Sequence, residues 1–432
     1  MTDRGNARVV TANRSQTSFD MIDMDAWLDA DHLARTVVAF VERLNLRPFY
    51  DAIKSREGDV GRAGLDPAVL LELWLYATID GIGSARAINR LTETDLAYRW
   101  LRGGMPLNHY TLSDFRVACG AELDRILSES LADLLVEGLV SLNDVLIDGT
   151  KLRASAGAGS YKTAAGLADA EQLARQRIAA LKTEIETDPT ACLRRREAAR
   201  LRAAHDQLAR IEAAKARRNQ VATERAARSD HSGGAKKKSE PKASMTDPDA
   251  RVMRFADGAH APGYNVQVAA TPDHGFIVAI LATDRRNDTD LASPVVAEIE
   301  RRLGQPPAVV IADQGYASAN DIVALATAPR PTMVYAPVPA ARADLKPQSL
   351  KRRDRRWELE PDAIKEWRSR MNTAEAVMKI KRRKRIELVN AHLKVGDFAR
   401  QVLRGLAKIQ TNCVLHALAH NLRTATRVRA AA

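Results

Sequence analysis

The sequence of 432 residues predicts a mixed α/β protein that begins with an all-helical unit and carries a pair of long helices between its first and second strands. Three observations support this prediction. Apolar residues at helical spacing fill the first third of the chain, and short apolar runs typical of buried strands recur after it. A long stretch rich in Ala, Arg and Glu separates the first two of those runs. A chain of this length can form two or three folded units, and we expect several.

The N-terminal unit is expected to be helical over residues 21–138. Asp66 is a favourable N-cap and Pro67 suits the first helical position, because its missing amide hydrogen has no helical partner there. The apolar run 68–79 continues this helix. Apolar residues recur at helical spacing again over 111–138, which predicts one further long helix.

The strands are expected where short apolar runs occur, at 144–148, 264–270, 276–283, 308–312 and 333–337. The second and third runs are separated by Thr-Pro-Asp-His-Gly at 271–275, which is typical of a turn and predicts an antiparallel hairpin. Helical segments alternate with the later strands. The pattern as a whole therefore predicts a mixed α/β sheet.

The stretch between the first and second strands is unlike either neighbour. Segments 167–187 and 191–228 have helical composition, and Asp188-Pro189 between them predicts a helical hairpin. A sparse apolar stripe is expected to hold it together, formed by Leu173, Ile178, Leu181, Ile185, Leu201, Leu208 and Ile211. We favour a solvated helical pair packed on itself, with direct DNA contact as the alternative. Residues 232–239 are expected to form a mobile basic linker.

The charge balance indicates a polyanionic partner. Lys and Arg number 66 against 54 Asp and Glu, a net charge of +12, so nucleic acid fits best, although ribosomal, chromatin and membrane-surface proteins share this property. Cys119, Cys192 and Cys413 lie far apart and predict no zinc finger or disulfide framework. The start of the chain lacks a secretory pattern, and its longest apolar stretch contains Glu72 and is too short to cross a bilayer. We therefore expect a cytoplasmic protein.

Two aspartates stand out because each follows or ends a buried strand. Asp148 precedes Gly149 at the end of the first run, and Asp313 precedes Gln314-Gly315 at the end of the fourth. A buried ionised carboxylate is costly unless it meets a metal, an ion pair or a proton. Each aspartate alone is also compatible with an ordinary turn before glycine.

A glutamate on a helix is the third candidate. Within 383–394, Glu387 shares one helical face with Arg383, Asn390 and Lys394. The alternative is a solvated face with ion pairs between residues four apart. Together, two strand-end aspartates and one helix glutamate are what two-metal phosphoryl chemistry needs, since Mg²⁺ prefers carboxylate oxygens.

At these motifs the sequence resembles the DDE transposases of insertion sequences, whose catalytic domain is RNase H-like. That family has its first acid in Asp-Gly-Thr and its second in Asp-x-Gly-Tyr, matched here by Asp148-Gly149-Thr150 and Asp313-Gln314-Gly315-Tyr316. The segments 246–249 and 263–267 resemble its approach to the second strand. The N-terminal segments 81–84 and 111–116 and the C-terminal segment 404–422 resemble its terminal helices.

The family's third acid lies in a Tyr-x₂-Arg-x₃-Glu-x₆-Lys signature. Arg383, Glu387 and Lys394 fall in register with it, whereas Ile380 stands at the tyrosine position and lacks the hydroxyl group. The resemblance implies that Asp148, Asp313 and Glu387 are catalytic and bind Mg²⁺, with Mn²⁺ able to substitute. It places the side chains of Arg383, Lys394, Asn390 and Lys151 on DNA.

The resemblance implies an enzyme that binds the terminal inverted repeats of its element, hydrolyses a phosphodiester and joins the 3′-OH end to target DNA. Its partners would be double-stranded DNA and at least one further subunit, with no membrane, and it would lie on the nucleoid when bound. The alternatives are a decayed or repurposed DNA-binding protein and a nuclease without strand transfer. The expected domains are a helical DNA-binding or assembly domain over 1–140, an RNase H-like domain over 141–154 and 245–425, a hairpin insertion with its basic linker over 155–244, and a basic tail over 426–432.

Overall fold

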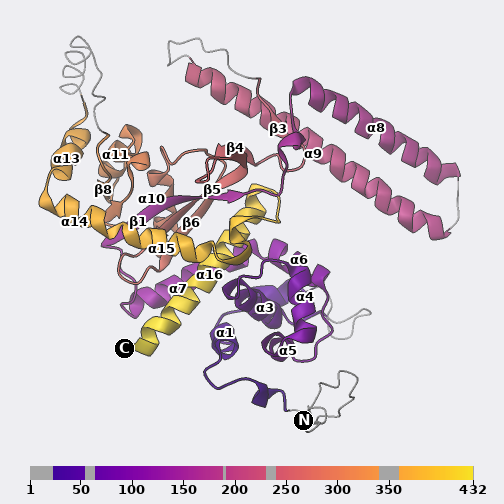
Figure 1. The fold of residues 1–432 in the computed structure, drawn as a ribbon, viewed down its shortest axis with the longest axis horizontal. Coiled ribbons are helices and arrows are strands. Elements are labelled where there is room, and N and C mark those ends of the chain that lie inside the picture. Colours follow the sequence, from indigo (N-terminus) through magenta and orange to yellow (C-terminus); the bar gives the residue numbers. More distant parts are fainter. Residues whose placement is uncertain (1–22, 54–63, 188–190, 230–239, 340–359, 432) are drawn as a thin grey trace, which may run out of the picture.

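The computed structural model describes residues 23–53, 64–187, 191–229, 240–339 and 360–431. Figure 1 shows a mixed sheet, a group of N-terminal helices and a long helical pair that projects from the sheet region. The expected turn at Asp188-Pro189 and the expected linker 232–239 lie outside the described residues.

The N-terminal region is helical as predicted. After a short 3-10 turn at Asp25–Trp27, the helices are α1 (Leu33–Val41), α2 (Arg47–Asp51), α3 (Pro67–Ile79), α4 (Ala85–Thr94), α5 (Leu96–Arg102), α6 (His109–Ala118) and α7 (Gly120–Val136). Asp66 caps α3 by accepting a hydrogen bond from the Ala68 amide. The single helix expected over 111–138 is wrong, because the chain turns at Cys119. This turn lets α6 pack against α3 and α4 while α7 packs against α16.

The sheet contains all five expected strands. Its members are β1 (Asp144–Arg153), β4 (Arg251–Arg254), β5 (His260–Ala270), β6 (Ile277–Thr283), β7 (Val309–Ile311) and β8 (Met333–Tyr335). The order is β4-β5-β1-β7-β8, with β6 also pairing β5. The β5–β6 hairpin is antiparallel as predicted. β1 is longer than expected because its pairing with β5 continues to Arg153, and β4 was not expected.

The sheet is mixed in direction. β1 runs antiparallel to β5, and β5 antiparallel to β4 and β6, whereas β7 and β8 run parallel to β1. The helices that follow are α10 (Ala292–Leu303), α11 (Ala319–Ala326), α13 (Asp362–Met371), α14 (Ala374–Arg382), α15 (Lys384–Leu393) and α16 (Leu406–Ala431). Because β1 continues to Arg153, well beyond its last pair with β7, the carboxyl end of β7 lies beside the middle of β1.

The C-terminal helix α16 joins the two halves of the molecule. It packs against β6 on one side and against α3 and α7 on the other, so one hydrophobic core continues from the sheet into the N-terminal helices (Figure 1). Asp247 accepts a hydrogen bond from the Gly405 amide and Asp249 one from the Leu406 amide, which fixes the start of α16. Residues 426–431, expected as a basic tail, continue α16.

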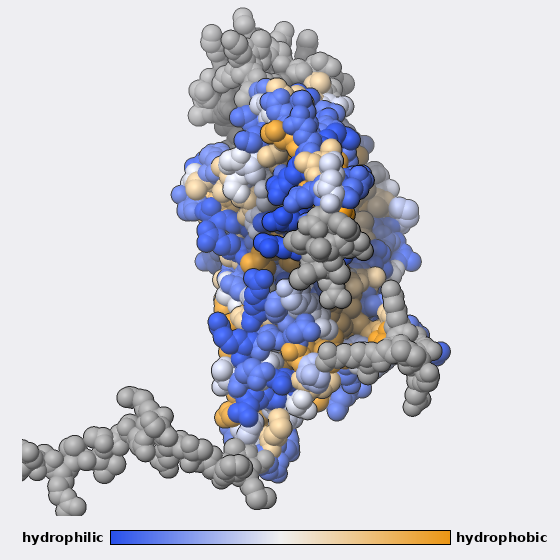
Figure 2. Space-filling model, turned by 90° about the vertical axis from the view of Figure 1, so that its right-hand side faces the viewer, coloured by the Kyte–Doolittle hydropathy of each residue, from blue (hydrophilic) through white to orange (hydrophobic). Residues whose placement is uncertain are grey.

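The long helical pair consists of α8 (Ala164–Thr187) and α9 (Ala191–Ser229), with the two-stranded ladder β2 (Tyr161–Lys162) and β3 (Ala243–Ser244) at its base. Ile178, Leu181 and Ala204 pack between the helices, as the favoured interpretation expects. Leu173 is 66% exposed, so its expected place in the apolar stripe is wrong; its position faces away from α9. The described part of the face in Figure 2 is mostly hydrophilic, with scattered apolar side chains.

Ion pairs tie the base of this helical pair to the sheet. Arg217 of α9 and Arg251 of β4 both pair with Asp284 just after β6, the second at 2.8 Å. Arg251 also reaches Glu224 of α9 at 2.9 Å. These pairs connect α9 to two elements of the sheet, so the hairpin is anchored at its base.

Candidate active site

Asp148 lies within β1, and Asp313 lies two residues beyond the end of the neighbouring parallel strand β7. β1 and β7 pair from Asp144 opposite Val309 to Leu146 opposite Ile311, and each aspartate follows the last of these pairs by two residues. The sheet backbone therefore brings together two carboxylates that are 165 residues apart in the sequence.

The Asp148 carboxylate is mostly buried, with 19% of its side chain exposed. Asn390 Nδ2 donates to Asp148 Oδ2 at 2.8 Å. Burial is the main reason that the pKa of Asp148 is raised to about 6; the Arg383 guanidinium opposes the rise, and the carboxylates of Asp313 and Asp288 contribute to it. The carboxylates of Asp148, Asp313 and Asp288 are thus close enough that the charge of one makes ionisation of the others less favourable.

Asp313 is fixed by its own turn. Its Oδ1 accepts a hydrogen bond from the Gly315 amide at 2.7 Å and caps the short 3-10 turn Gln314–Tyr316. This turn directs Tyr316 into the protein, where its fully buried hydroxyl donates to Gln267 Oε1 on β5. The Asp-x-Gly-Tyr motif therefore sets the aspartate at the surface and anchors the turn to a neighbouring strand.

Asp288 is a third carboxylate beside these two, and sequence reasoning missed it. Its Oδ1 accepts hydrogen bonds from Asn265 Nδ2 at 2.8 Å and from Gln267 Nε2 at 2.9 Å. It lies in the loop between β6 and α10, so no strand pattern marks it. The available signal was the Asn and Gln of 263–267, which alternate on one face of β5 and need polar partners once buried.

The motif glycines leave space for these acids. A Cβ atom at Gly149 would collide with the Asp288 carboxylate, and one at Gly315 would lie 2.9 Å from Asp313 Oδ1. In the sequence we interpreted both glycines as turn residues. Their closest contacts show that they also leave room for the carboxylates of Asp288 and Asp313.

Glu387 is held quite differently from the aspartates. It lies in the first turn of α15, its side chain is 58% exposed, and its Oε1 accepts from Arg383 Nη2 at 3.1 Å. Arg383 Nη1 lies 3.9 Å from Asp148 Oδ1. The Arg383 guanidinium therefore stands between Asp148 and Glu387, at the place a cation shared by these two acids would take.

The expected helix over 383–394 is observed as α15, with Arg383 as its N-cap and Lys394 as its C-cap. Asn390 is 6% exposed and contacts Asp148, so it faces the acids and not the surface. Lys394 is exposed, and its side chain makes no hydrogen bond or ion pair with another described residue. Lys151 is not brought to the acids. It follows Asp148 by three strand positions and donates to the Arg254 carbonyl at 2.8 Å.

The neighbouring arginines are engaged elsewhere, which identifies Arg383 as the one that faces the acids. Arg382 pairs with Asp144 at 2.8 Å and with Asp273 at 2.7 Å. Ile380 is part of the separate helix α14 and packs against the core. The helix break at Arg383 means that Ile380 and Glu387 do not share one continuous helical face.

The carboxylate and amide oxygens near Asp148 suit a hard divalent cation, although the described carboxylates do not come close enough together to bind one ion. Among the described residues, no three His, Cys, Asp or Glu side chains come together closely enough to hold a metal. The buried oxygens Asn390 Oδ1 and Asn265 Oδ1, beside Asp148 and Asp288, have no hydrogen-bond partner. Carboxylate and amide oxygens are ligands that Mg²⁺ accepts, so the residues fit this ion once Glu387 and Arg383 separate.

Comparisons with known proteins give two matching family models, and both are described as transposase domains. A family model described as a transposase DDE domain matches residues 236–422, which include Asp313 and Glu387, and one described as Transposase domain (DUF772) matches residues 22–118. No curated protein and no solved structure shows significant similarity to the chain. In the described part of the chain, no helix is long and apolar enough to cross a membrane. The two matches cover the helical N-terminal region and most of the sheet region, and the chain belongs to the DDE transposases of insertion sequences.

Proposed function

We propose that the protein binds the terminal inverted repeats of its insertion sequence, hydrolyses a phosphodiester to expose a 3′-OH, and joins that end to target DNA. Asp148, Asp313 and Glu387 are the catalytic carboxylates in this proposal. The observation that supports it is the parallel pairing of β1 with β7, because Asp148 and Asp313 each follow the last printed pair, Leu146 with Ile311, by two residues. Family membership supports the substrate class, and the net charge of +12 suits DNA.

The proposed metal ligands are the same three carboxylates, with Mg²⁺ as the ion and Mn²⁺ able to replace it. When bound, such ions activate the attacking oxygen and stabilise the leaving oxygen of a phosphodiester. Asp148 and Asp313 supply a platform fixed by the backbone. Glu387 joins them when its exposed side chain leaves Arg383, which is then free to bind a DNA phosphate.

The remaining residues have supporting roles in this proposal. Asn390 orients the Asp148 carboxylate through its 2.8 Å hydrogen bond, in place of the DNA contact expected from sequence. Asp288 holds Asn265 and Gln267 in position beside the site and keeps the local potential negative until a cation binds. Lys394, exposed and without a described partner, contacts a phosphate.

The proposed organisation keeps the boundaries expected from sequence. The mixed sheet over 141–154 and 245–425 is the RNase H-like catalytic domain, residues 1–140 bind DNA or assemble subunits, and 155–244 form an insertion. The three antiparallel strands β6, β5 and β1, followed by the parallel strands β7 and β8, support the catalytic assignment. We propose that the enzyme acts on DNA in the cytoplasm as a dimer or larger assembly.

A plasmid assay tests this function. The full chain is incubated in Mg²⁺ with a labelled duplex that ends in the inverted repeat flanking its gene, together with a supercoiled target. Joined products that require Asp313 are expected. Cut ends without joining would indicate a nuclease, and binding without cutting would indicate a repurposed DNA-binding protein. The separation of Glu387 from the two aspartates and the presence of Ile380 at the tyrosine position favour this last alternative.

A further inference from the structure

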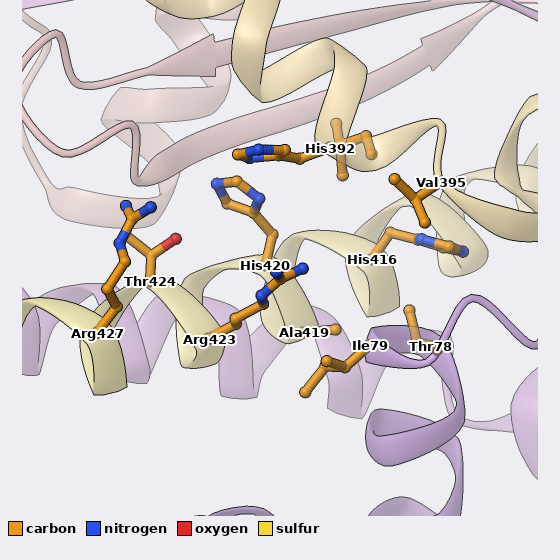
Figure 3. A pocket seen from close by; sticks show the side chains of 11 residues that line it. Thr78, Ile79, His392, Val395, His416, Ala419, His420, Arg423, Thr424 and Arg427 are labelled. Atoms are coloured by element: carbon orange, nitrogen blue, oxygen red, sulfur yellow. The ribbon is translucent and has the colours of Figure 1, made fainter. Parts of the chain in front are cut away.

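A basic cavity of about 160 Å³ lies between the end of α3, the end of α15 and the middle of α16. Figure 3 shows His392 of α15 lying over His420 of α16, with two arginines reaching toward the cavity from the same helix. Its basic lining residues are His392, His416, His420, Arg423 and Arg427. Within the described part of the chain, no acidic residue lines it. The cavity therefore gathers positive groups with nothing on its walls to neutralise them.

The guanidinium groups of the two arginines that line the cavity have no hydrogen-bond or ion-pair partner among the described residues. Arg423 and Arg427 are exposed, and neither makes a hydrogen bond or ion pair with another described residue. Arg429, two residues further along the same helix, instead forms a two-pronged pair with Glu137 at 2.7 and 2.8 Å. Of these three arginines, the two that line the cavity have no side-chain partner among the described residues. Guanidinium groups match phosphate oxygens in geometry and charge.

Three histidines also line the cavity, and the nearby positive charges affect their pKa values. His420 Nε2 lies 2.9 Å from the Gly275 carbonyl, which fixes the ring and leaves Nδ1 for another partner. Burial is the main reason that the pKa of His420 is lowered to about 4; the Gly275 carbonyl opposes this change, and His392, Arg423 and Arg427 contribute to it.

The pKa values of His392 and His416 are also lowered. Burial, Arg423, Arg427 and Arg385 lower the pKa of His392. Burial and Arg116 lower the pKa of His416 to about 3. A bound anion would reverse this effect on the rings that it touches, because it favours the protonated imidazole.

The cavity is separate from the candidate active site. His392 follows Asn390 by two residues, so at about 100° per residue the two side chains leave α15 on opposite faces. Asn390 contacts Asp148, whereas His392 faces α16. A group bound in the cavity is therefore not the reacting phosphodiester.

We propose that this cavity binds a backbone phosphate of the DNA substrate, away from the bond that is cut, and so sets the position of the duplex across α15. Arg423 and Arg427 contact the phosphate oxygens, and His420 Nδ1 and His392 complete the ligand shell. This inference rests on the proposed function, because DNA is taken as the source of the phosphate.

The first test measures how DNA affinity depends on salt. The full chain carrying Arg423→Gln or Arg427→Gln is titrated with duplex DNA in EDTA, so that cutting plays no part. Each variant should lose roughly tenfold in affinity, and the slope of log affinity against log salt should fall by about 0.9, because one phosphate contact is lost. Arg429→Gln removes the same charge from the same helix and should leave the slope unchanged. Equal slopes for all three variants would overturn the proposal.

The second test uses histidine NMR to identify the anion. The pKa values of His392 and His420 are measured in the Asp313→Asn protein, alone, with duplex DNA and with inorganic phosphate. DNA should raise both values, and Arg423→Gln should remove that rise. A response to inorganic phosphate without one to DNA would overturn the DNA assignment, and no response to either would overturn the site. Failure of the proposed function would appear instead as absent cutting in Mg²⁺, which neither test uses.

Discussion

The two strand aspartates and the helix glutamate belong to one proposed site, yet the protein holds them in different ways. Asp148 is fixed within β1 by pairing with β5 and is 19% exposed, and Asp313 is fixed by the turn that it caps just after β7. Glu387 is 58% exposed and is positioned only by its own side chain and its pair with Arg383. The backbone therefore fixes one half of the site, whereas side-chain conformation determines the other half.

This difference indicates how the site can assemble. A residue within a paired strand or at the cap of a turn cannot move without loss of hydrogen bonds, but an exposed glutamate changes rotamer at low cost. In the structure, the Arg383 guanidinium balances the negative charges of Asp148 and Glu387. We infer that the two aspartates keep their positions and that the Glu387 side chain moves toward them when a cation or DNA binds.

The largest expected effect is on cleavage. Asp148→Asn, Asp313→Asn and Glu387→Gln should each reduce it by about a thousandfold or more, because phosphoryl transfer on hard cations needs every anionic ligand. Cleavage of an element-end duplex in Mg²⁺ measures this, and thermal melts confirm folding. Asp257→Asn, in an exposed pair with Arg153 at the last residue of β1, is the matched control and should cleave like the parent. Cleavage within a few fold of the parent would remove that residue from the site.

A smaller effect is expected at Asp288, which belongs with the fixed half of the comparison. Asp288→Asn should lower cleavage by roughly 10- to 100-fold, since it removes a negative charge beside Asp148, although the amide oxygen can still accept from Asn265 and Gln267. Single-turnover rates at saturating DNA separate this loss from weaker binding. A rate equal to that of the Asp257→Asn control would show that Asp288 is only structural.

The smallest effects concern DNA affinity on the helix side. Lys394→Ala should reduce the slope of log affinity against log salt by about one unit in EDTA. Arg383→Ala should change it less in EDTA, because the acids occupy that guanidinium, and by about one unit in Ca²⁺, which supports binding with little turnover. Salt titrations in both media check this. An equal slope change for Arg383→Ala in the two media would show that Arg383 does not alternate between acids and DNA.

Glu387→Gln provides the reverse control for these titrations. Loss of an acid beside the phosphates relieves repulsion when no metal is present, so affinity in EDTA should hold or rise by a few fold. Fluorescence anisotropy with the same duplex measures it. A marked loss of affinity would mean that Glu387 supports the DNA-binding surface through Arg383.

Much of the fold followed from local patterns. The apolar runs predicted β1, β5, β6, β7 and β8, and the composition of 167–228 predicted α8 and α9. Each depends on residues near in sequence, which is why spacing alone was informative. The helix break at Arg383 was not predicted, because neither Pro nor Gly marks it. The extension of β1 to Arg153 depends on pairing with β5, which local sequence does not contain.

The candidate site was predictable only in part, for the same reason. The motifs indicated Asp148, Asp313 and Glu387, but the placement of the two aspartates on neighbouring parts of the sheet comes from the pairing of β1 with β7. Asp288 lies in a loop and acquires its place through Asn265 and Gln267, a contact across more than twenty residues. The contact of Asn390 with Asp148 spans 242 residues, so the sequence suggested DNA binding where the structure shows a partner for an acid.

The most direct test of the difference between the two halves is metal binding by the full chain without DNA. Mn²⁺ titrations followed by electron paramagnetic resonance compare the parent with Asp148→Asn, Asp313→Asn and Glu387→Gln. If the strand aspartates form the fixed platform, their variants should bind Mn²⁺ at least about tenfold more weakly, whereas Glu387→Gln should stay within about threefold of the parent. Equal losses in all three variants, or a larger loss for Glu387→Gln than for either aspartate variant, would contradict this account.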